Sequence, residues 1–235
     1  MRNWFTFAGM DSRDFGIYIS GQGTYNAPEK MYNMIEIPGR SGNLVGIENR
    51  LANVELTYPA FIYDSFKQQI ANMKSAFLAL NGYQRLSDTY NPEEYRLAVF
   101  HGGTEVNATV MNDAGQFELT FDCKPQRYLL SGERDVDVTA SLQIVNPTAF
   151  ESKPLIRVYG YGTLGINSDS ITIANQFSYV DIDCEMMDCY SGTSNANPYV
   201  SFSSNNFPTL RAGENNFTKT ANITQIKVIP RWWQV

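Results

Sequence analysis

The segment Gln116-Phe117-Glu118-Leu119-Thr120-Phe121-Asp122-Cys123 alternates polar and apolar side chains with a period of two. Successive side chains of a β-strand point to opposite faces, so this alternation predicts a half-buried strand. Similar short runs, separated by Gly, Pro and Asn, recur at 17–19, 34–37, 54–58, 95–100, 155–160, 171–173, 179–183, 199–202 and 223–229. Because short strands recur along the whole chain, we expect a mainly β protein.

One segment departs from this rhythm. Between Tyr63 and Leu80 the apolar residues recur at steps of four and three, and they are Phe66, Ile70, Met73, Phe77 and Leu80. This spacing places them on one face of an α-helix, which we expect to pack over a sheet. Asp64 or Ser65 is expected to cap the start of the helix, and Asn81-Gly82 to end it. No second helical pattern appears.

Length and composition set the scale of the fold. The 235 residues are 43% hydrophobic, enough for one large or two modest domains with a core. We place an N-terminal domain at 1–130, a connector with weak strands at 131–153, and a C-terminal domain at 154–235. The short, regularly spaced strands of the last domain indicate a β-sandwich.

Charge and cysteine content exclude several classes of protein. The net charge is −6, divided equally between residues 1–130 and 131–235. A protein that grips nucleic acid needs a basic face, so specific DNA binding is not expected, although DNA passing through an acidic channel is compatible. The three cysteines suggest neither a disulfide framework nor a zinc site, and synthesis in a reducing compartment fits them. We recognise no signal peptide and no segment for membrane insertion.

Candidate catalytic residues are few. His101 lacks a recognisable partner, and a solvated loop histidine is the alternative. The acids Asp181, Asp183, Glu185 and Asp188 could bind calcium or hydrolyse a glycoside, but the same spacing is typical of a solvent-facing strand. The glycine pattern of 160–165 resembles a dinucleotide fingerprint without its helix, so a β-turn connection is the better interpretation. We therefore expect no catalytic residue, cofactor or metal site.

Two sets of residues suggest binding. Pro38-Gly39-Arg40-Ser41-Gly42 forms a tight loop around an arginine, suited to an anion or to a neighbouring chain's carboxylate, or it is a plain hairpin turn. Trp232, Trp233 and Tyr199 are candidates for docking a partner or for stacking on a sugar. Adjacent strand residues point to opposite faces, so at most one of the two tryptophans can join a given surface.

Several motifs together resemble the distal tail proteins (Dit) of long-tailed siphophages. They are residues 4–9 and 11–17, Ile37 to Leu44, the helix at 63–80, residues 153–160, Phe207 to Leu210, Gly213 to Asn216 and Pro230 to Trp233. The resemblance covers nearly the whole chain in the expected order. A His-x-Asn-x-Arg string of the kind that galectins use is absent from the sequence.

The resemblance implies a fold and a role. The fold would combine an N-terminal ring-forming β domain, with a helix and a hairpin, and a C-terminal galectin-like β-sandwich. Six copies would close a homohexameric ring around a lumen through which DNA leaves during host attachment and genome ejection. The partners would be the tail tube protein, the tail-associated tip protein, the tape measure protein and receptor-binding or baseplate proteins. The protein would be made in the host cytoplasm and become part of the virion.

Two other functions stay open from the residues alone. The chain could be a carbohydrate-binding module protein, which would bind glycans without forming a ring. It could also be a glycoside hydrolase that uses the acids between Asp181 and Asp188. The absence of a convincing active site favours binding or assembly over catalysis.

Overall fold

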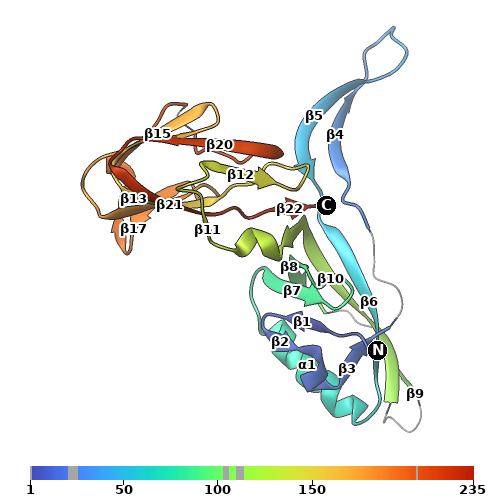
Figure 1. Cartoon of the computed structure of the whole chain (residues 1–235). Coiled ribbons are helices and arrows are strands. Elements are labelled where there is room, and N and C mark those ends of the chain that lie inside the picture. Colours follow the sequence, from blue (N-terminus) through green and yellow to red (C-terminus); the bar gives the residue numbers. More distant parts are fainter. Residues whose placement is uncertain (1, 21–25, 103–105, 110–113, 205) are drawn as a thin grey trace. The chain divides into compact units, whose positions relative to one another are not determined.

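A computed structural model describes residues 2–20, 26–102, 106–109, 114–204 and 206–235. The chain divides into two compact units, one of residues 1–127 with Val235 and one of residues 128–234. Both are built mainly from strands, and α1 (Phe66–Leu78) is the only α-helix among the described residues (Figure 1). The prediction of a mainly β chain with one helix is confirmed.

The first unit is organised around one antiparallel sheet. Its strands lie in the order β2-β1-β7-β8-β10-β6-β3, and β9 pairs with β10. The bounds are β1 (Phe5–Phe7), β2 (Met10–Asp11), β3 (Ile17–Ile19), β6 (Val54–Ile62), β7 (Gln84–Asp88), β8 (Glu94–Phe100), β9 (Val106–Thr109) and β10 (Ala114–Leu129), with a 3-10 turn, η1 (Ser12–Phe15), between β2 and β3.

The segment whose polar and apolar residues alternate in the sequence lies in β10, which pairs with β6. The pairs run from Gly115 opposite Ile62 to Cys123 opposite Val54. Phe117, Leu119 and Phe121 are buried, and so are the facing positions of β6, because alternate residues of both strands point to the core. The other face of this pair is polar from Glu55 to Thr57 and from Glu118 to Asp122, and it becomes aromatic at Phe61.

Helix α1 covers the apolar face of the sheet. Its buried residues are Phe66, Ile70, Met73 and Phe77, which confirms the predicted face. The helix is shorter than predicted at both ends. Ser65 adopts a left-handed backbone at the N-cap without a side-chain hydrogen bond, so the helix begins at Phe66. Gly82 has a φ of +71° beyond its end.

A β-hairpin forms a separate sheet of the first unit. It consists of β4 (Lys30–Ile35) and β5 (Leu44–Leu51), which pair with each other and with no further described strand. At its base, Ala52 N donates to Glu29 O at 2.8 Å, and Asn26 Nδ2 donates to Glu55 O at 3.2 Å. Figure 1 draws the hairpin as a long arm that leads into β6.

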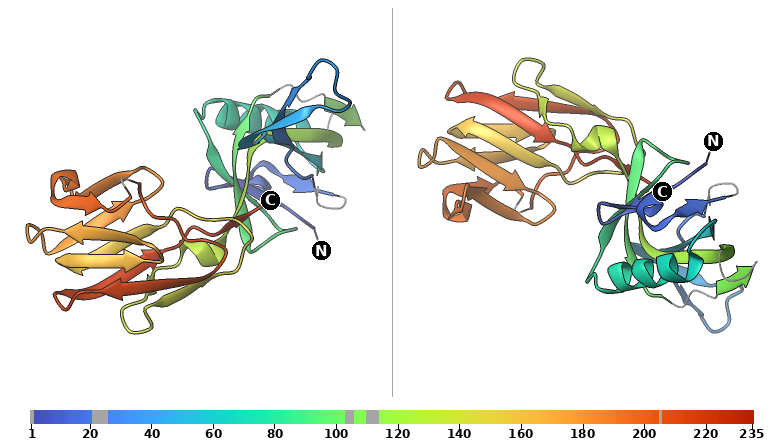
Figure 2. Two further views of the ribbon diagram at one scale, coloured as in Figure 1. Left: turned by 90° about the horizontal axis from the view of Figure 1, so that it is seen from above. Right: turned by 90° about the horizontal axis from the view of Figure 1, so that it is seen from below.

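The second unit is a sandwich of two sheets, seen as two layers in Figure 2. One sheet has the order β11-β21-β13-β16-β17-β18, and the other has the order β12-β20-β14-β15-β19. One core contains residues of both sheets, such as Val158 and Ile182 from the first and Leu164 and Phe217 from the second. The predicted β-sandwich is confirmed.

The bounds of this unit's elements are η2 (Leu130–Glu133), β11 (Val136–Asp137), β12 (Gln143–Asn146), β13 (Leu155–Gly160), β14 (Gly162–Ile166), β15 (Asp169–Ile173), β16 (Tyr179–Asp183), β17 (Asp188–Ser191), β18 (Ser194–Asn195), η3 (Asn197–Tyr199), β19 (Val200–Phe202), β20 (Gly213–Lys219), β21 (Ile223–Ile229) and β22 (Trp233–Gln234). Residues 131–153, treated from the sequence as a connector, contribute β11, which pairs with β21, and β12, which pairs with β20.

Strand β10 runs beyond the alternating segment of residues 116–123 and continues through Lys124-Pro125 to Leu129. The last pair between β10 and β6 joins Cys123 to Val54. Beyond this pair no residue of β6 faces Pro125, so its missing N–H removes no hydrogen bond to β6.

Phe77 tests the packing of α1 on the sheet. Its ring is 1% exposed, and its centroid lies 5.1 Å from that of Phe7 and 5.6 Å from those of Phe15 and Phe100. We expect Phe77→Ala to lower the free energy of unfolding by about 3–5 kcal/mol, because it leaves a cavity among these rings. Urea unfolding measures the change, and Lys67→Ala, on the exposed face of α1, should stay within about 0.5 kcal/mol of wild type. Equal losses for both variants would contradict this packing.

Candidate functional site

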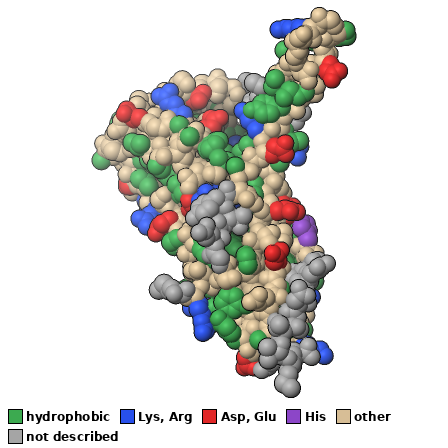
Figure 3. Space-filling view, turned by 90° about the vertical axis from the view of Figure 1, so that its right-hand side faces the viewer, with side chains coloured by type: hydrophobic (Ala, Val, Ile, Leu, Met, Phe, Trp, Pro, Cys, Tyr) green, Lys and Arg blue, Asp and Glu red, His purple; other side chains and the backbone are tan. Residues whose placement is uncertain are grey.

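The hairpin β4–β5 exposes an unusual amount of apolar surface. Every residue of β4 is exposed. Met34 and Leu44 are 56% and 51% exposed, and both faces of the hairpin carry apolar side chains. Figure 3 shows hydrophobic side chains along this arm. The set, called here the hairpin patch, is Met31, Tyr32, Met34, Ile35, Ile37, Leu44 and Val45. Monomeric proteins rarely leave such a surface in water, so the patch marks an interaction site.

The loop at the hairpin tip is the segment Pro38–Gly42 singled out in the sequence. Gly39 and Gly42 have φ values of +80° and +86°, which a side chain would strain, and Arg40 N donates to Ile37 O at 3.1 Å. All five residues are exposed, and Arg40 makes no ion pair within the described part of the chain. The loop is thus a hairpin turn that also presents a guanidinium beside the hairpin patch.

The polar face of β6 and β10 is acidic. Glu55 lies opposite Asp122. Glu118 lies four residues from Asp122 along β10, and these three carboxylates share the face turned away from α1. His101 lies there too, 66% exposed, with Nε2 3.5 Å from Asp122 Oδ2. Figure 3 shows acidic side chains on the same face as the single histidine. This surface, called here the acidic face, repels other anions.

An aromatic cluster lies at the β3 end of the same sheet. The ring centroids of Phe61 and Tyr63 are 4.9 Å apart, and Tyr18 lies 6.0 Å from Phe61. The Arg2 guanidinium carbon is 4.7 Å from the centroid of Tyr63. Tyr63 is 55% exposed, so the cluster offers a second apolar surface on the first unit.

The motif at residues 11–16 has a structural role. Asp11 Oδ1 caps η1 by accepting from Arg13 N at 2.9 Å, and Gly16 ends the turn with a φ of +65°. The buried Ser12 hydroxyl donates to Ile17 O and accepts from Phe5 N. This hydroxyl therefore joins the start of β1 to the start of β3.

The two adjacent tryptophans differ in burial, as expected for neighbouring residues that point to opposite faces. Trp232 is 4% exposed and belongs to the core of the second unit. Trp233 is half-buried, donates from Nε1 to Glu151 O at 2.9 Å, and stacks on Phe150 at 4.4 Å. Tyr199, 39% exposed, contacts the Phe177 ring edge-on. Among the described residues, Tyr199 makes no ring contact with either tryptophan. Trp233 and Tyr199 are therefore two separate candidate docking residues and do not form one surface.

Two of the four candidate carboxylates, Asp181 and Asp183, are buried in ion pairs, whereas Glu185 is exposed and Asp188 is half-buried. Asp181 receives two hydrogen bonds from Arg157, at 2.6 and 2.8 Å. Asp183 receives two from Arg231, at 2.7 and 2.8 Å, which hold the pKa of Asp183 below its usual value. Neither the described acids nor the described cysteines and histidine form a group of three or more that could hold a metal ion. The arginines lie 24 and 48 residues away in sequence, so spacing alone could not reveal these pairs.

The remaining motifs are structural. Cys123, Cys184 and Cys189 are free and buried, and burial raises the pKa of each thiol to about 12, which keeps it neutral. Residues 160–165 form the connection between β13 and β14 and the start of β14. None of the described helices is long and apolar enough to cross a membrane.

Sequence reasoning missed the hairpin patch, although a signal was present. Met31-Tyr32 and Met34-Ile35 are adjacent apolar pairs, so both faces of the strand must be apolar. A strand with one solvent face would alternate instead. The strand was predicted only as residues 34–37, whereas β4 spans Lys30–Ile35, and its need for cover on both faces was not recognised.

Comparisons with known proteins agree with this arrangement. Residues 11–123 match the family of the phage tail protein RIFT-related domain. The crystal structure of phage SPP1 Dit (gp 19.1), described as a paradigm of the hub adsorption apparatus in phages that infect Gram-positive bacteria, has the same fold. The TM-score is 0.79 at 12% identity, over 99% of each chain. No curated protein matches the sequence. The resemblance to distal tail proteins seen in the motifs is confirmed.

The Asp183–Arg231 pair predicts acid sensitivity of the second unit. The pKa of Asp183 is lowered in the folded state, so the pair stabilises the fold above the ordinary carboxyl pKa of about 4. This contribution is lost as the pH falls through the lower folded value. We expect Asp183→Asn to cost about 3 kcal/mol at neutral pH and to flatten the loss of stability between about pH 5 and pH 2.

Urea unfolding monitored by tryptophan fluorescence across this pH range checks the expectation. Glu185→Gln is the matched control, because Glu185 is exposed and its nearest cation, Lys153, is 3.8 Å away. An Asp183→Asn protein with an unchanged pH profile would show that the pair contributes nothing to the acid sensitivity.

Proposed function

We propose that this chain is the ring-forming hub of a siphophage tail tip. The match to the phage tail RIFT-related domain and the fold shared with a distal tail protein support this proposal. Six copies close a ring between the tail tube and the baseplate or receptor-binding apparatus. The lumen of the ring lets DNA pass at ejection. The role is structural, and the burial of Asp181 and Asp183 in arginine pairs supports it over hydrolysis.

The hairpin patch is the observation that carries this proposal. Its apolar side chains have no cover within the described chain, and a second copy of the same chain can supply that cover. A ring needs a heterologous contact, in which one surface of each copy meets a different surface of the next. The hairpin patch and the aromatic cluster at Tyr18, Phe61 and Tyr63 are two such different apolar surfaces on one unit.

A receiving site lies beside that cluster. A pocket of about 380 Å³ is lined by Phe61, Tyr63, Gly115 and Gln116. The hairpin of one copy packs there, and the turn at Pro38–Gly42 brings Arg40 to a carboxylate of the neighbouring copy or of the tail tube protein. Arg40 has no ion pair among the described residues, and its fork of donors fits a carboxylate, which suits it to such a contact.

The acidic face lines the lumen in this proposal. Glu55, Glu118 and Asp122 would surround the passing DNA with negative charge, which prevents adhesion to the phosphates. The first 130 residues carry a net charge of −3, in keeping with a channel that does not grip DNA.

The second unit docks the surrounding tip proteins. A sandwich can carry galectin-like topology without galectin activity, so its fold does not assign a ligand. Trp233 and Tyr199 are the proposed contacts for the tail-associated tip protein or receptor-binding proteins. The chain is made in the host cytoplasm and is then incorporated into the virion with the tape measure protein and the tail tube.

Ring assembly gives a direct mutational test. Ile35 is 44% exposed in the single chain, so Ile35→Asp should leave the fold intact but place a charge in the subunit contact. We expect its mass by light scattering to fall from six chains toward the single-chain value of 26.5 kDa, and Arg40→Ala to weaken assembly in part.

The control is Val145→Asp, which adds the same charge at a residue that is 60% exposed on β12. This variant should keep the mass of wild type. An Ile35→Asp protein with the wild-type mass would place the subunit contact elsewhere.

The lumen proposal predicts a gain of DNA binding. Glu55→Lys with Glu118→Lys should make the ring retain duplex DNA in a gel-shift experiment at low salt, because the added cations gather around one pore. Glu151→Lys with Glu185→Lys makes the same charge change on the second unit and should retain much less DNA. Equal retention by both variants, or a lumen lined mainly by Lys and Arg, would refute the assignment.

A further inference from the structure

We propose that the outer face of the sheet β11-β21-β13-β16-β17-β18 contains a subsite for a neutral sugar ring, bound through a vicinal pair of hydroxyl groups. The site lies wholly within the second unit and uses neither Trp233 nor Tyr199. It goes beyond the proposed hub function and does not depend on ring formation.

The sheet register brings the polar residues of the subsite together. Asp137 on β11 lies opposite Lys227 on β21, Lys227 lies opposite Arg157 on β13, and Arg157 lies opposite Asp181 on β16. Neighbouring residues on β13 and β21, such as Ile156 and Val228, point into the core. The polar row therefore crosses the outer face of the sheet.

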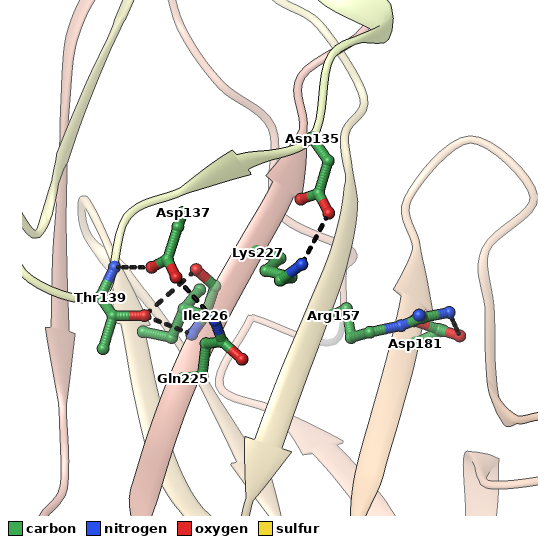
Figure 4. Close-up of polar contacts among 8 residues, drawn as sticks. All are labelled: Asp135, Asp137, Thr139, Arg157, Asp181, Gln225, Ile226 and Lys227. Atoms are coloured by element: carbon green, nitrogen blue, oxygen red, sulfur yellow. Dashed lines mark hydrogen bonds and ion pairs between the residues drawn. The ribbon is translucent and has the colours of Figure 1, made fainter.

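Each charged group in this row is held by a partner, as Figure 4 shows. Arg157 donates from Nε and Nη2 to Asp181, and Lys227 Nζ donates to Asp135 Oδ2 at 3.0 Å. Asp137 accepts from Thr139 N at 2.9 Å and from Gln225 Nε2 at 2.6 Å. Because these contacts fix the side chains before a ligand arrives, binding costs little side-chain entropy.

A pocket of about 100 Å³ opens between the two ion pairs. It is lined by Asp135 and Lys227, by Arg157 and Asp181, and by the aliphatic side chains of Leu155 and Ile229. Arg157 is bound to Asp181 and also to Tyr159, whereas Lys227 Nζ bonds only Asp135 Oδ2 among the described residues and keeps hydrogens for a ligand, with carboxylate oxygens beside them. The pocket thus offers donors and acceptors in alternation over an apolar floor.

The alternating hydrogen-bond donors and acceptors of the pocket favour a ligand with two neighbouring hydroxyl groups. Each hydroxyl of a vicinal pair both donates and accepts, so it can give its proton to a carboxylate and accept from the neighbouring cation. The C–H groups of a pyranose ring would contact Leu155 and Ile229. Pockets that combine apolar walls with a few convergent polar groups are typical of small-ligand sites.

The charge balance argues against an anionic ligand. Within the pocket lining, Arg157 and Lys227 are neutralised by Asp181 and Asp135, and Asp137 adds one further negative charge opposite Lys227 outside the lining. The two tyrosines Tyr159 and Tyr179, with ring centroids 5.8 Å apart, adjoin Arg157, whose guanidinium carbon is 4.9 Å from the Tyr179 ring. They extend the surface on which a second sugar unit would lie.

Saturation-transfer NMR on the full chain tests the subsite. The probes are methyl α-D-glucopyranoside, methyl α-D-galactopyranoside and methyl N-acetyl-β-D-glucosaminide. We expect at least one to bind with a dissociation constant in the millimolar range, and we expect its fully O-methylated analogue, which keeps the ring but has no hydroxyl donors, to bind at least about tenfold more weakly.

Lys227→Met removes the donor and leaves the Arg157–Asp181 pair intact. We expect it to raise the dissociation constant at least about tenfold. Lys153→Met, the same change at an exposed lysine that does not line the pocket, should bind like wild type. Asp135→Asn is the second variant in case Lys227→Met does not fold, and it should also weaken binding.

Four results would overturn the proposal. They are absence of saturation transfer from all three glycosides, equal binding of the O-methylated analogue, equal effects of Lys227→Met and Lys153→Met, and displacement of the glycoside by acetate or phosphate at lower concentrations than by the free sugar. The last result would identify an anion site instead. Ring mass is measured separately, so failure here leaves the hub function unaffected.

Discussion

The antiparallel pairing of β6 with β10 is the constraint on which the first unit depends. Its alternation sends Phe117, Leu119 and Phe121 toward α1, where aromatic rings from several strands share one core. The same alternation sends Glu55, Glu118 and Asp122 to the opposite face. A shift of register by one residue would exchange the two faces, so one pairing fixes both the core and the acidic surface.

The two units differ in how far their own residues pair or cover their charged and apolar side chains. The second unit neutralises its buried acids internally, since Asp181 and Asp183 each bind an arginine through two hydrogen bonds. Its outer face therefore carries fixed, mutually compensated charges. The first unit leaves the hairpin patch uncovered within the described chain. In the proposed ring, contacts between copies would bury the hairpin patch that folding leaves exposed.

Sequence reasoning found the elements that local pattern controls. The strands 155–160, 179–183 and 223–229 have the predicted bounds, because their alternation ends at glycine, proline or polar turns. The apolar face of α1 was also predicted, while its ends depended on the backbone at Ser65. Contacts between residues that are distant in the sequence could not be predicted from local patterns. The burial of Asp181 depends on Arg157 from another strand, and Pro125 is tolerated because β6 ends beside it. The loop at Pro38–Gly42 was identified from the sequence, but the exposed apolar residues of the hairpin patch beside it were overlooked.

The proposed hub requires identical copies of the chain to surround an open channel. Electron microscopy of the purified wild-type chain, with classification of single particles, tests it most directly. We expect particles with sixfold symmetry, a central opening that admits duplex DNA, and the hairpin of each copy against its neighbour. Particles that are single chains at every protein concentration, without a central opening, would contradict it.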